Sequence, residues 1–290
     1  MSAAGLRSGK GHHDENFPVA SWLIKPRYRA PILAFYRFAR AADDVADHAS
    51  AAPDEKLRLL DEMERTLLGE LDSAPEAFAL RNVLRERGLS EQHALLLLEA
   101  FRRDVTKLRY ANWDELMDYC RYSAMPVGRF VLDVHGEART TWPASDALCA
   151  ALQVINHLQD CAKDRRELDR VYLPLDTMAE FGATIEMLGE ARAQPQLHNV
   201  IAALAHRTQG LLAQSKPFSA QIADRRLALE VGLIQALADD LNHRLLKRDP
   251  LSERVHHRKI EMVPLATAAL IRFVFRRRSK PSPAEFTPQT

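Results

Sequence analysis

Two acidic segments of the chain carry side chains that could bind a metal ion. The first holds Asp43 and Asp47, and the second holds Asn156, Asp160 and Asp164. The ligands within each segment are four residues apart, a spacing that places them on one face of an α-helix. Both segments lie in apolar sequence, where an ionised carboxylate is costly unless a cation neutralises it. Two such faces turned toward each other would offer the oxygen ligands that Mg²⁺ prefers, so the sequence predicts a magnesium site.

Other polar side chains share these two faces. Tyr36 and Arg40 precede Asp43 on the first face, and Gln153 precedes Asn156 on the second. Arg40 could simply pair with the neighbouring carboxylates, and such a surface pair contributes only about 0–1 kcal/mol. The alternative is a site for a diphosphate, because metal ions and arginines stabilise the negative charge that develops as a C–O bond breaks. The carbocation left behind would need an apolar, aromatic-lined cavity that excludes water.

Helical periodicity dominates the sequence, and no convincing alternating strand pattern is present. We expect an all-α fold in a single domain, with helices over residues 29–48, 54–72, 76–87, 90–108, 113–134, 145–164, 180–192, 197–215, 218–247 and 261–276. The segment 165–178 lacks this periodicity and is expected to be an ordered loop. Pro126 should kink helix 113–134, which also supplies Tyr119; this tyrosine could line the cavity or could be an ordinary core residue.

Composition limits the classes to which the protein can belong. The 290 residues include 40 basic and 39 acidic side chains, a balance that gives no reason to expect nucleic-acid binding. Three cysteines without metal-type spacing fit a reducing compartment, and a cytoplasmic location is expected. Neither a secretory signal nor an apolar run long enough to span a bilayer is present. We expect residues 1–14 to be a flexible N-terminus, residues 15–278 to form one domain and residues 279–290 to be a disordered tail.

The C-terminal segment 270–280 joins apolar residues to a run of arginines. It could dock peripherally on anionic lipid at the inner face of the cell membrane. It could equally be a final core helix whose basic end is solvated. The sequence favours neither interpretation.

Four linked motifs of this sequence resemble those of the squalene/phytoene synthase family. The motifs are Tyr36-x-x-x-Arg40-x-x-Asp43-x-x-x-Asp47, Tyr119-Cys120-x-x-x-Ala124-x-x-Val127-Gly128, Gln153-x-x-Asn156-x-x-x-Asp160-x-x-x-Asp164 and Arg170-x-Tyr172-Leu173-Pro174. The resemblance extends over residues 15–265. It implies an isoprenoid synthase helical bundle with a central active-site cavity, more than one Mg²⁺ ion and an isoprenoid diphosphate as substrate.

The resemblance also implies roles for individual residues. The metal ligands would be Asp43, Asp47, Asn156, Asp160 and Asp164. The catalytic residues would be Tyr119 together with Asp43, Asp47 and Asp160. Arg40 and Arg170 would hold the diphosphate. The remaining substrate contacts would come from Phe17, Ser21, Tyr36, Gln153 and Tyr172.

Two departures from the family pattern point to one branch of it. Members that condense two prenyl diphosphates carry Arg immediately before the middle Asp of the second motif, where this chain has Gln159. They also carry a Ser-Phe pair where this chain has Asn16 and Phe17. The loss of a positive charge and a hydroxyl group suggests a site that handles one diphosphate. In these features the chain resembles the bacterial hydroxysqualene synthases of hopanoid biosynthesis.

That resemblance implies that presqualene diphosphate and water react to give hydroxysqualene and diphosphate, without NADPH. It also implies functional coupling with a presqualene diphosphate synthase and with a squalene-forming reductase. Two alternatives stay open. The chain could be a head-to-head prenyl synthase that makes presqualene diphosphate, squalene or phytoene from farnesyl or geranylgeranyl diphosphate. It could also be a non-catalytic, membrane-associated assembly factor, although such a protein has no need of the metal-facing ligands.

Overall fold

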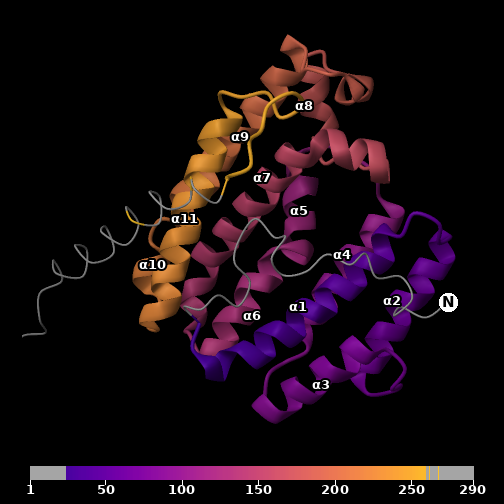
Figure 1. Ribbon diagram of the computed structural model, residues 1–290, viewed down its shortest axis with the longest axis vertical. Helices are drawn as coiled ribbons and strands as arrows, with labels where there is room; N and C mark the ends of the chain where they lie inside the picture. The colour runs from indigo at the N-terminus through magenta and orange to yellow at the C-terminus, as the bar shows by residue number, and fades with distance from the viewer. Residues whose placement is uncertain (1–23, 259–260, 262–266, 268–290) are drawn as a thin grey trace, which may run out of the picture.

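Helices make up the fold of the part of the chain that the structure describes, residues 24–258, 261 and 267 of a computed structural model (Figure 1). They are α1 (Pro26–Asp47), α2 (Pro53–Leu68), α3 (Pro75–Arg87), α4 (Gln92–Thr106), α5 (Trp113–Ser123), α6 (Met125–His135), η2 (Arg139–Thr141), α7 (Trp142–Leu168), α8 (Leu175–Glu180), η3 (Ile185–Gly189), α9 (Pro195–Ser215), α10 (Phe218–Gln221) and α11 (Arg225–Leu245). These residues contain no β-strand, and the all-α prediction is confirmed. The predictions for residues 1–14, Phe17, Ser21, residues 270–280 and residues 279–290 lie outside the described residues, as does nearly all of helix 261–276.

Proline, serine and glycine set several helix boundaries. Pro53 begins α2, where its missing N–H costs no hydrogen bond. Ser90 Oγ accepts a hydrogen bond from the backbone N–H of Gln92, 3.1 Å away, at the start of α4. Both helices begin within two residues of the predicted starts at residues 54 and 90. Gly69 and Gly88, with φ values of 91° and 62°, end α2 and α3, so α2 is shorter than the expected 54–72.

Two of the expected helices are each divided in two. The span 113–134 becomes α5 and α6, which are separated by the non-helical residue Ala124. Pro126 lies in the first turn of α6, so it begins a new helix where a kink was expected. The span 218–247 divides into α10 and α11, and Asp224 caps α11 by accepting hydrogen bonds from the backbone N–H groups of Arg226 and Leu227.

The region after the second acidic segment differs most from the prediction. α7 continues to Leu168 and α8 begins at Leu175, so the loop expected over 165–178 is confined to the residues between these helices. The helix expected over 180–192 is wrong. Gly182 interrupts it with a φ of 68°, and only the short η3 follows.

The loop after α7 pairs with the segment after α4. The backbone N–H of Val171 donates to the carbonyl of Leu108 over 3.0 Å, and that of Leu175 donates to the carbonyl of Tyr110 over 2.9 Å. These bonds hold the loop against the end of α4. Arg170, which lies in this loop, is thereby brought close to α1 and α4.

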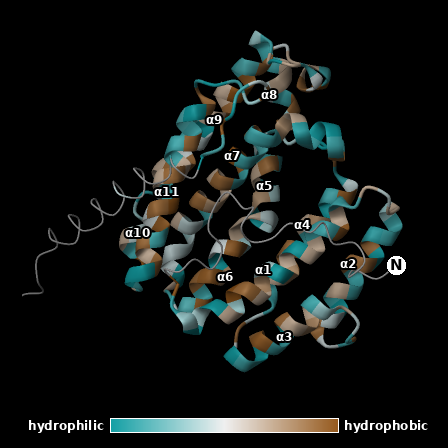
Figure 2. Ribbon diagram, in the orientation of Figure 1, coloured by the Kyte–Doolittle hydropathy of each residue, from teal (hydrophilic) through white to brown (hydrophobic). Residues whose placement is uncertain are grey.

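Buried apolar side chains in the described residues form two clusters. One joins α1, α2, α3 and α4 and includes Phe130 of α6, and the other surrounds α7 with residues of α5, α9 and α11. Polar and apolar residues alternate along most helices, as expected where each helix packs through one face (Figure 2). None of the described helices combines the length and the apolar character that crossing a membrane requires.

Candidate active site

A cavity of about 620 Å³ borders on both clusters of buried side chains. All of the predicted site residues within the described part of the chain line it, namely Tyr36, Arg40, Asp43, Asp47, Tyr119, Gln153, Asn156, Asp160, Asp164, Arg170 and Tyr172. Four motifs that are far apart in the sequence therefore face one space. The predicted contacts Phe17 and Ser21 lie outside the described residues.

The cavity has a polar end and an apolar end. Its lining follows α7 from Ser145 to Leu168, a stretch of about 35 Å at 1.5 Å per residue. Four of the lining acids, Asp43, Asp47, Asp160 and Asp164, lie toward the C-terminal ends of α1 and α7, and Asp104 of α4 and Glu230 of α11 also line the cavity. Apolar lining residues such as Phe35 and Leu148 lie toward the N-terminal ends of the same two helices. A ligand that is charged at one end and apolar along the rest matches this division.

Arg40 pairs with two carboxylates on α1. Its Nη1 donates to Asp43 Oδ2 over 2.5 Å, and its Nη2 donates to Asp44 Oδ1 over 3.3 Å. The simple pairing considered from the sequence is therefore present, but it does not offset the crowding of negative charge. Burial and the nearby charge of Asp47 raise the pKa of Asp43 to about 7 despite the opposing effect of Arg40.

The acids of α7 show the same crowding. Burial and the charge of Asp160 raise the pKa of Asp164 to about 7, and Asp47 of α1 adds to the rise. The two acidic faces therefore act on each other across the cavity. No three acidic, histidine or cysteine side chains among the described residues converge tightly enough to hold an ion alone. The donor set still fits Mg²⁺, which relieves carboxylate repulsion and is bound through a few carboxylates together with water and substrate phosphates.

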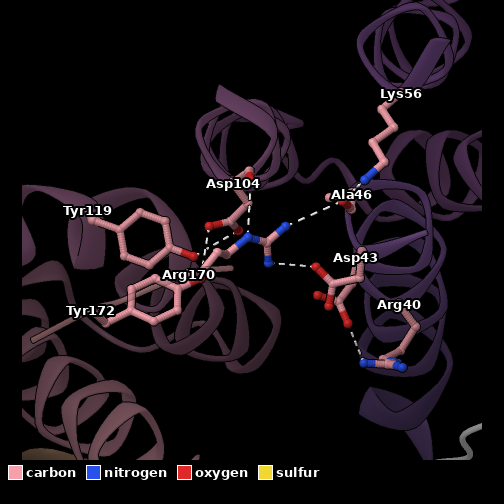
Figure 3. Close-up of polar contacts among 9 residues, drawn as sticks. Arg40, Asp43, Ala46, Lys56, Asp104, Tyr119, Arg170 and Tyr172 are labelled. Atoms are coloured by element: carbon pink, nitrogen blue, oxygen red, sulfur yellow. Dashed lines mark hydrogen bonds and ion pairs between the residues drawn. The ribbon is translucent and has the colours of Figure 1, made fainter. Parts of the chain in front are cut away.

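Arg170 connects its loop to two helices, α1 and α4, at the polar end (Figure 3). Its Nη1 donates to Asp47 Oδ1 over 2.6 Å and its Nη2 donates to the carbonyl of Ala46 over 3.3 Å, both on α1. Its Nε donates to the carbonyl of Asp104 on α4 over 3.0 Å. Lys56 of α2 also donates to the carbonyl of Ala46, over 2.9 Å. Arg170 thus fixes Asp47 relative to α4 and places positive charge beside the acids.

Asp104 is a functional candidate that the sequence did not reveal. Its buried carboxylate accepts hydrogen bonds from the hydroxyl groups of Tyr119 at 2.8 Å and Tyr172 at 3.0 Å (Figure 3). Burial raises the pKa of Asp104 to about 6, although Arg170 opposes the rise. Asp104 follows Arg103 in the sequence, and two adjacent charged residues are typical of a solvated helix face. Only the tertiary contacts identify it.

Aromatic rings stack beside the two tyrosines. The Tyr172 ring lies between His157, with centroids 3.6 Å apart, and Tyr110, with centroids 5.5 Å apart. Gln153 Nε2 lies 3.0 Å from His157 Nε2. Burial and, to a lesser extent, the charge of Arg170 lower the pKa of His157 to about 3, so the imidazole is neutral. His157 lines the cavity, a position for which the sequence alone gives no signal.

Gln159 does not lie where a side chain would have to lie to change the charge of the diphosphate site. Its side chain is buried but is not among those that line the cavity. Within the described residues neither its Oε1 nor its Nε2 has a hydrogen-bond partner. Successive residues of a helix point in different directions, and on α7 it is the next residue, Asp160, that faces the cavity. The expectation that Gln159 changes the charge of the diphosphate site is not supported by its position.

Comparison with known proteins gives a consistent assignment. Residues 10–261 match the family model for squalene/phytoene synthase. A hydroxysqualene synthase of Rhodopseudomonas palustris is 58% identical over 276 residues, which cover 95% of this chain and 94% of that protein. A hydroxysqualene synthase of Zymomonas mobilis is 57% identical over 271 residues, which cover 93% of this chain and 91% of that protein.

Solved structures share the fold. A squalene synthase of Alicyclobacillus acidocaldarius gives a TM-score of 0.68 at 30% identity, covering 94% of this chain and 93% of that chain. A dehydrosqualene synthase in complex with a ligand gives a TM-score of 0.75 at 22% identity, covering 90% of this chain and 93% of that chain. With the matched region extending over every helix that lines the cavity, the chain belongs to the squalene/phytoene synthase family.

Proposed function

We propose that this chain converts presqualene diphosphate and water to hydroxysqualene and diphosphate. The observation that carries the proposal is the cavity, which combines Arg40, Arg170 and two acidic faces at one end with a largely apolar lining along the rest. A diphosphate group attached to long hydrocarbon chains fits both parts. Support for this particular reaction comes from the hydroxysqualene synthases that are 57% and 58% identical along nearly the whole chain.

Mg²⁺ would be held at the polar end by the carboxylates of Asp43, Asp47, Asp160 and Asp164 and by the amide oxygen of Asn156. When bound, the metal would neutralise the diphosphate and so favour its departure. Arg40 would supply further positive charge, and Arg170 keeps Asp47 in place through their 2.6 Å ion pair. Asp43 and Asp164, with pKa values of about 7, would each lose a proton before they can ligate a cation.

Tyr119 would stand beside the carbon that loses the diphosphate. Its hydroxyl proton is directed to Asp104, over 2.8 Å, so the phenol oxygen and the ring can only present negative partial charge to a carbocation. The hydrocarbon chains would lie along the apolar lining, which includes Phe35 and Phe130, stacked with centroids 4.0 Å apart. This lining would exclude bulk water while the carbocation rearranges.

The proposed reaction also implies partners. An enzyme that forms presqualene diphosphate must supply the substrate, and a reductase that removes the hydroxyl group would carry the product on to squalene. Both substrate and product are poorly soluble in water. Contact between the segment 270–280 and a membrane would ease their transfer.

The test is a comparison of two substrates. Purified protein is incubated with presqualene diphosphate or with farnesyl diphosphate, in each case with Mg²⁺ or with EDTA. We expect Mg²⁺-dependent release of diphosphate from presqualene diphosphate, and hydroxysqualene whose oxygen comes from ¹⁸O-labelled water. Turnover of farnesyl diphosphate alone would favour the head-to-head synthase instead. Turnover of neither substrate would favour a non-catalytic role.

A further inference from the structure

The proposed reaction needs one water molecule at one place in a cavity whose lining is largely apolar. The carbocation forms where the diphosphate departs, and its rearrangement moves the charge by only a few bonds, so water has to add near the polar end and not deep among apolar side chains. A water molecule in such a place is held only if the protein offers it hydrogen-bond partners. The side chains at the boundary between the two ends are therefore the ones to consider.

Gln153 and His157 lie at that boundary. Along α7 the lining passes from Leu148 and Leu152 to Gln153 and His157, and then to Asp160. Gln153 and His157 are one helical turn apart, and both face the cavity. They stand where the apolar lining gives way to the acids.

The hydrogen bond between these two side chains leaves polar atoms for a ligand. Gln153 Nε2 is 3.0 Å from His157 Nε2, and because an amide nitrogen only donates, the imidazole accepts at Nε2 and carries its proton on Nδ1. Within the described part of the chain, His157 Nδ1 and Gln153 Oε1 make no further hydrogen bond. One donor and one acceptor thus remain, which is what a bridging water molecule requires.

The imidazole is also held in a fixed place. Its ring stacks on Tyr172 at an angle of 16°, and the hydroxyl of Tyr172 is fixed by Asp104 at 3.0 Å. Tyr119 donates to the same carboxylate, and its ring centroid lies 6.0 Å from that of His157. A water molecule on His157 would therefore keep a constant position relative to a carbon that faces Tyr119.

We propose that His157, together with Gln153, holds the water molecule that captures the carbocation and thereby makes the product an alcohol. This inference rests on the proposed function. The water oxygen forms the new C–O bond, and one of its protons passes to the diphosphate that has just left, so His157 does not change its charge. Without the held water, the carbocation would lose a proton from a neighbouring carbon to the same diphosphate and become a hydrocarbon.

The test variant is His157→Phe, which keeps a flat ring against Tyr172 but has no ring nitrogen. It is assayed with presqualene diphosphate and Mg²⁺, and the rate of diphosphate release and the ratio of hydroxysqualene to hydrocarbon are both measured. We expect diphosphate release within about threefold of the unmodified protein and a fall of about tenfold in the ratio, as for the loss of one hydrogen bond. Gln153→Met should shift the ratio in the same direction.

The control is Gln159→Met on the same helix, where the side chain is buried but does not line the cavity. Its product ratio should equal that of the unmodified protein. Circular dichroism shows which of the His157→Phe and Gln153→Met proteins are folded. If a folded variant gives the same product ratio as the unmodified protein, the inference is overturned, whatever the rate of diphosphate release. If the unmodified protein releases no diphosphate from presqualene diphosphate, the proposed function fails instead.

Discussion

Asp104 connects the groups at the polar end through both its side chain and its backbone. Its carboxylate accepts hydrogen bonds from Tyr119 and Tyr172, while its carbonyl accepts one from Arg170. Arg170 in turn holds Asp47. The carboxylate therefore orients the tyrosines, and its charge helps to offset that of the buried guanidinium.

Asp104→Asn tests this positioning role. The amide keeps the shape of the side chain but removes its charge and one acceptor oxygen, so we expect kcat on presqualene diphosphate to fall about 10- to 100-fold. The control is Asp118→Asn, which removes a partly exposed acid that pairs with Arg103 over 2.8 Å and should change kcat by less than about twofold. A folded Asp104→Asn protein with unchanged kcat would show that the network has no role in turnover.

The pKa values of Asp43 and Asp164, each about 7, predict that Mg²⁺ binding depends on pH. Below pH 7 these carboxyl groups hold protons that a metal must displace, whereas above pH 7 they are already ionised. We expect the Kd for Mg²⁺ to fall as the pH rises from about 6 to about 8, with proton release that is largest at the acidic end. Titration calorimetry in two buffers of different ionisation enthalpy measures both. A Kd that is constant over this range would contradict the assignment.

Local spacing accounts for which site residues could be predicted from the sequence. Asp43 and Asp47, and likewise Asp160 and Asp164, are neighbours on one turn of a helix, so their shared direction follows from sequence separation alone. Asp104 has no such partner on its own helix, and its contacts with Tyr119 and Tyr172 depend on how α4, α5 and the loop after α7 pack. The residue type at position 159 says nothing of which way its side chain points, and Gln159 is buried without lining the cavity.

At the scale of elements, α6 packs closely against α7 at Gly128. A Cβ atom at this position would lie 2.5 Å from Ser145 Oγ and 2.6 Å from Cys149 Sγ. All three residues line the cavity. The absent side chain thus allows the two helices to pack along the apolar part of the cavity.

Gly128→Ala should therefore destabilise the protein. We expect the free energy of unfolding in urea to fall by about 1–3 kcal/mol, since the added methyl group has to displace buried neighbours. Gly210→Ala in α9 is the matched control, because no atom lies within 4 Å of the added Cβ. That change should be neutral or should stabilise the protein by up to about 1 kcal/mol. Equal stabilities of the two variants would mean that α6 and α7 can separate at no cost.

Helix boundaries were predictable where a local signal exists. Pro53 and Ser90 lie at the starts of α2 and α4, close to the predicted starts at residues 54 and 90, because the hydrogen bonds of a first helical turn are decided locally. Pro126 was recognised as a disruption, yet whether a proline kinks one helix or begins another depends on the packing of both parts. The helix predicted over 180–192 does not form, because the chain turns at Gly182 and only the short η3 follows.

At the scale of the whole molecule, the polar end joins the two packed clusters. Asp43 and Asp47 extend from the cluster of α1 to α4, and Asp160 and Asp164 extend from α7 in the other. The ion pair between Arg170 and Asp47 already connects the two halves. Bound Mg²⁺ and diphosphate would complete that connection. Neither acidic face should therefore support diphosphate release without the other.

The most direct test compares two variants, Asp43→Ala and Asp160→Ala. It measures the rate at which each releases diphosphate from presqualene diphosphate in the presence of Mg²⁺. Each change removes a carboxylate from a different helix, and we predict that either one lowers the rate by at least about a thousandfold while the circular dichroism spectrum is retained. Asp61→Ala, which removes an acid with 61% of its side chain exposed, is the control and should release diphosphate at the unmodified rate. Near-normal release by a folded Asp43→Ala or Asp160→Ala protein would contradict the claim that the two faces form one site.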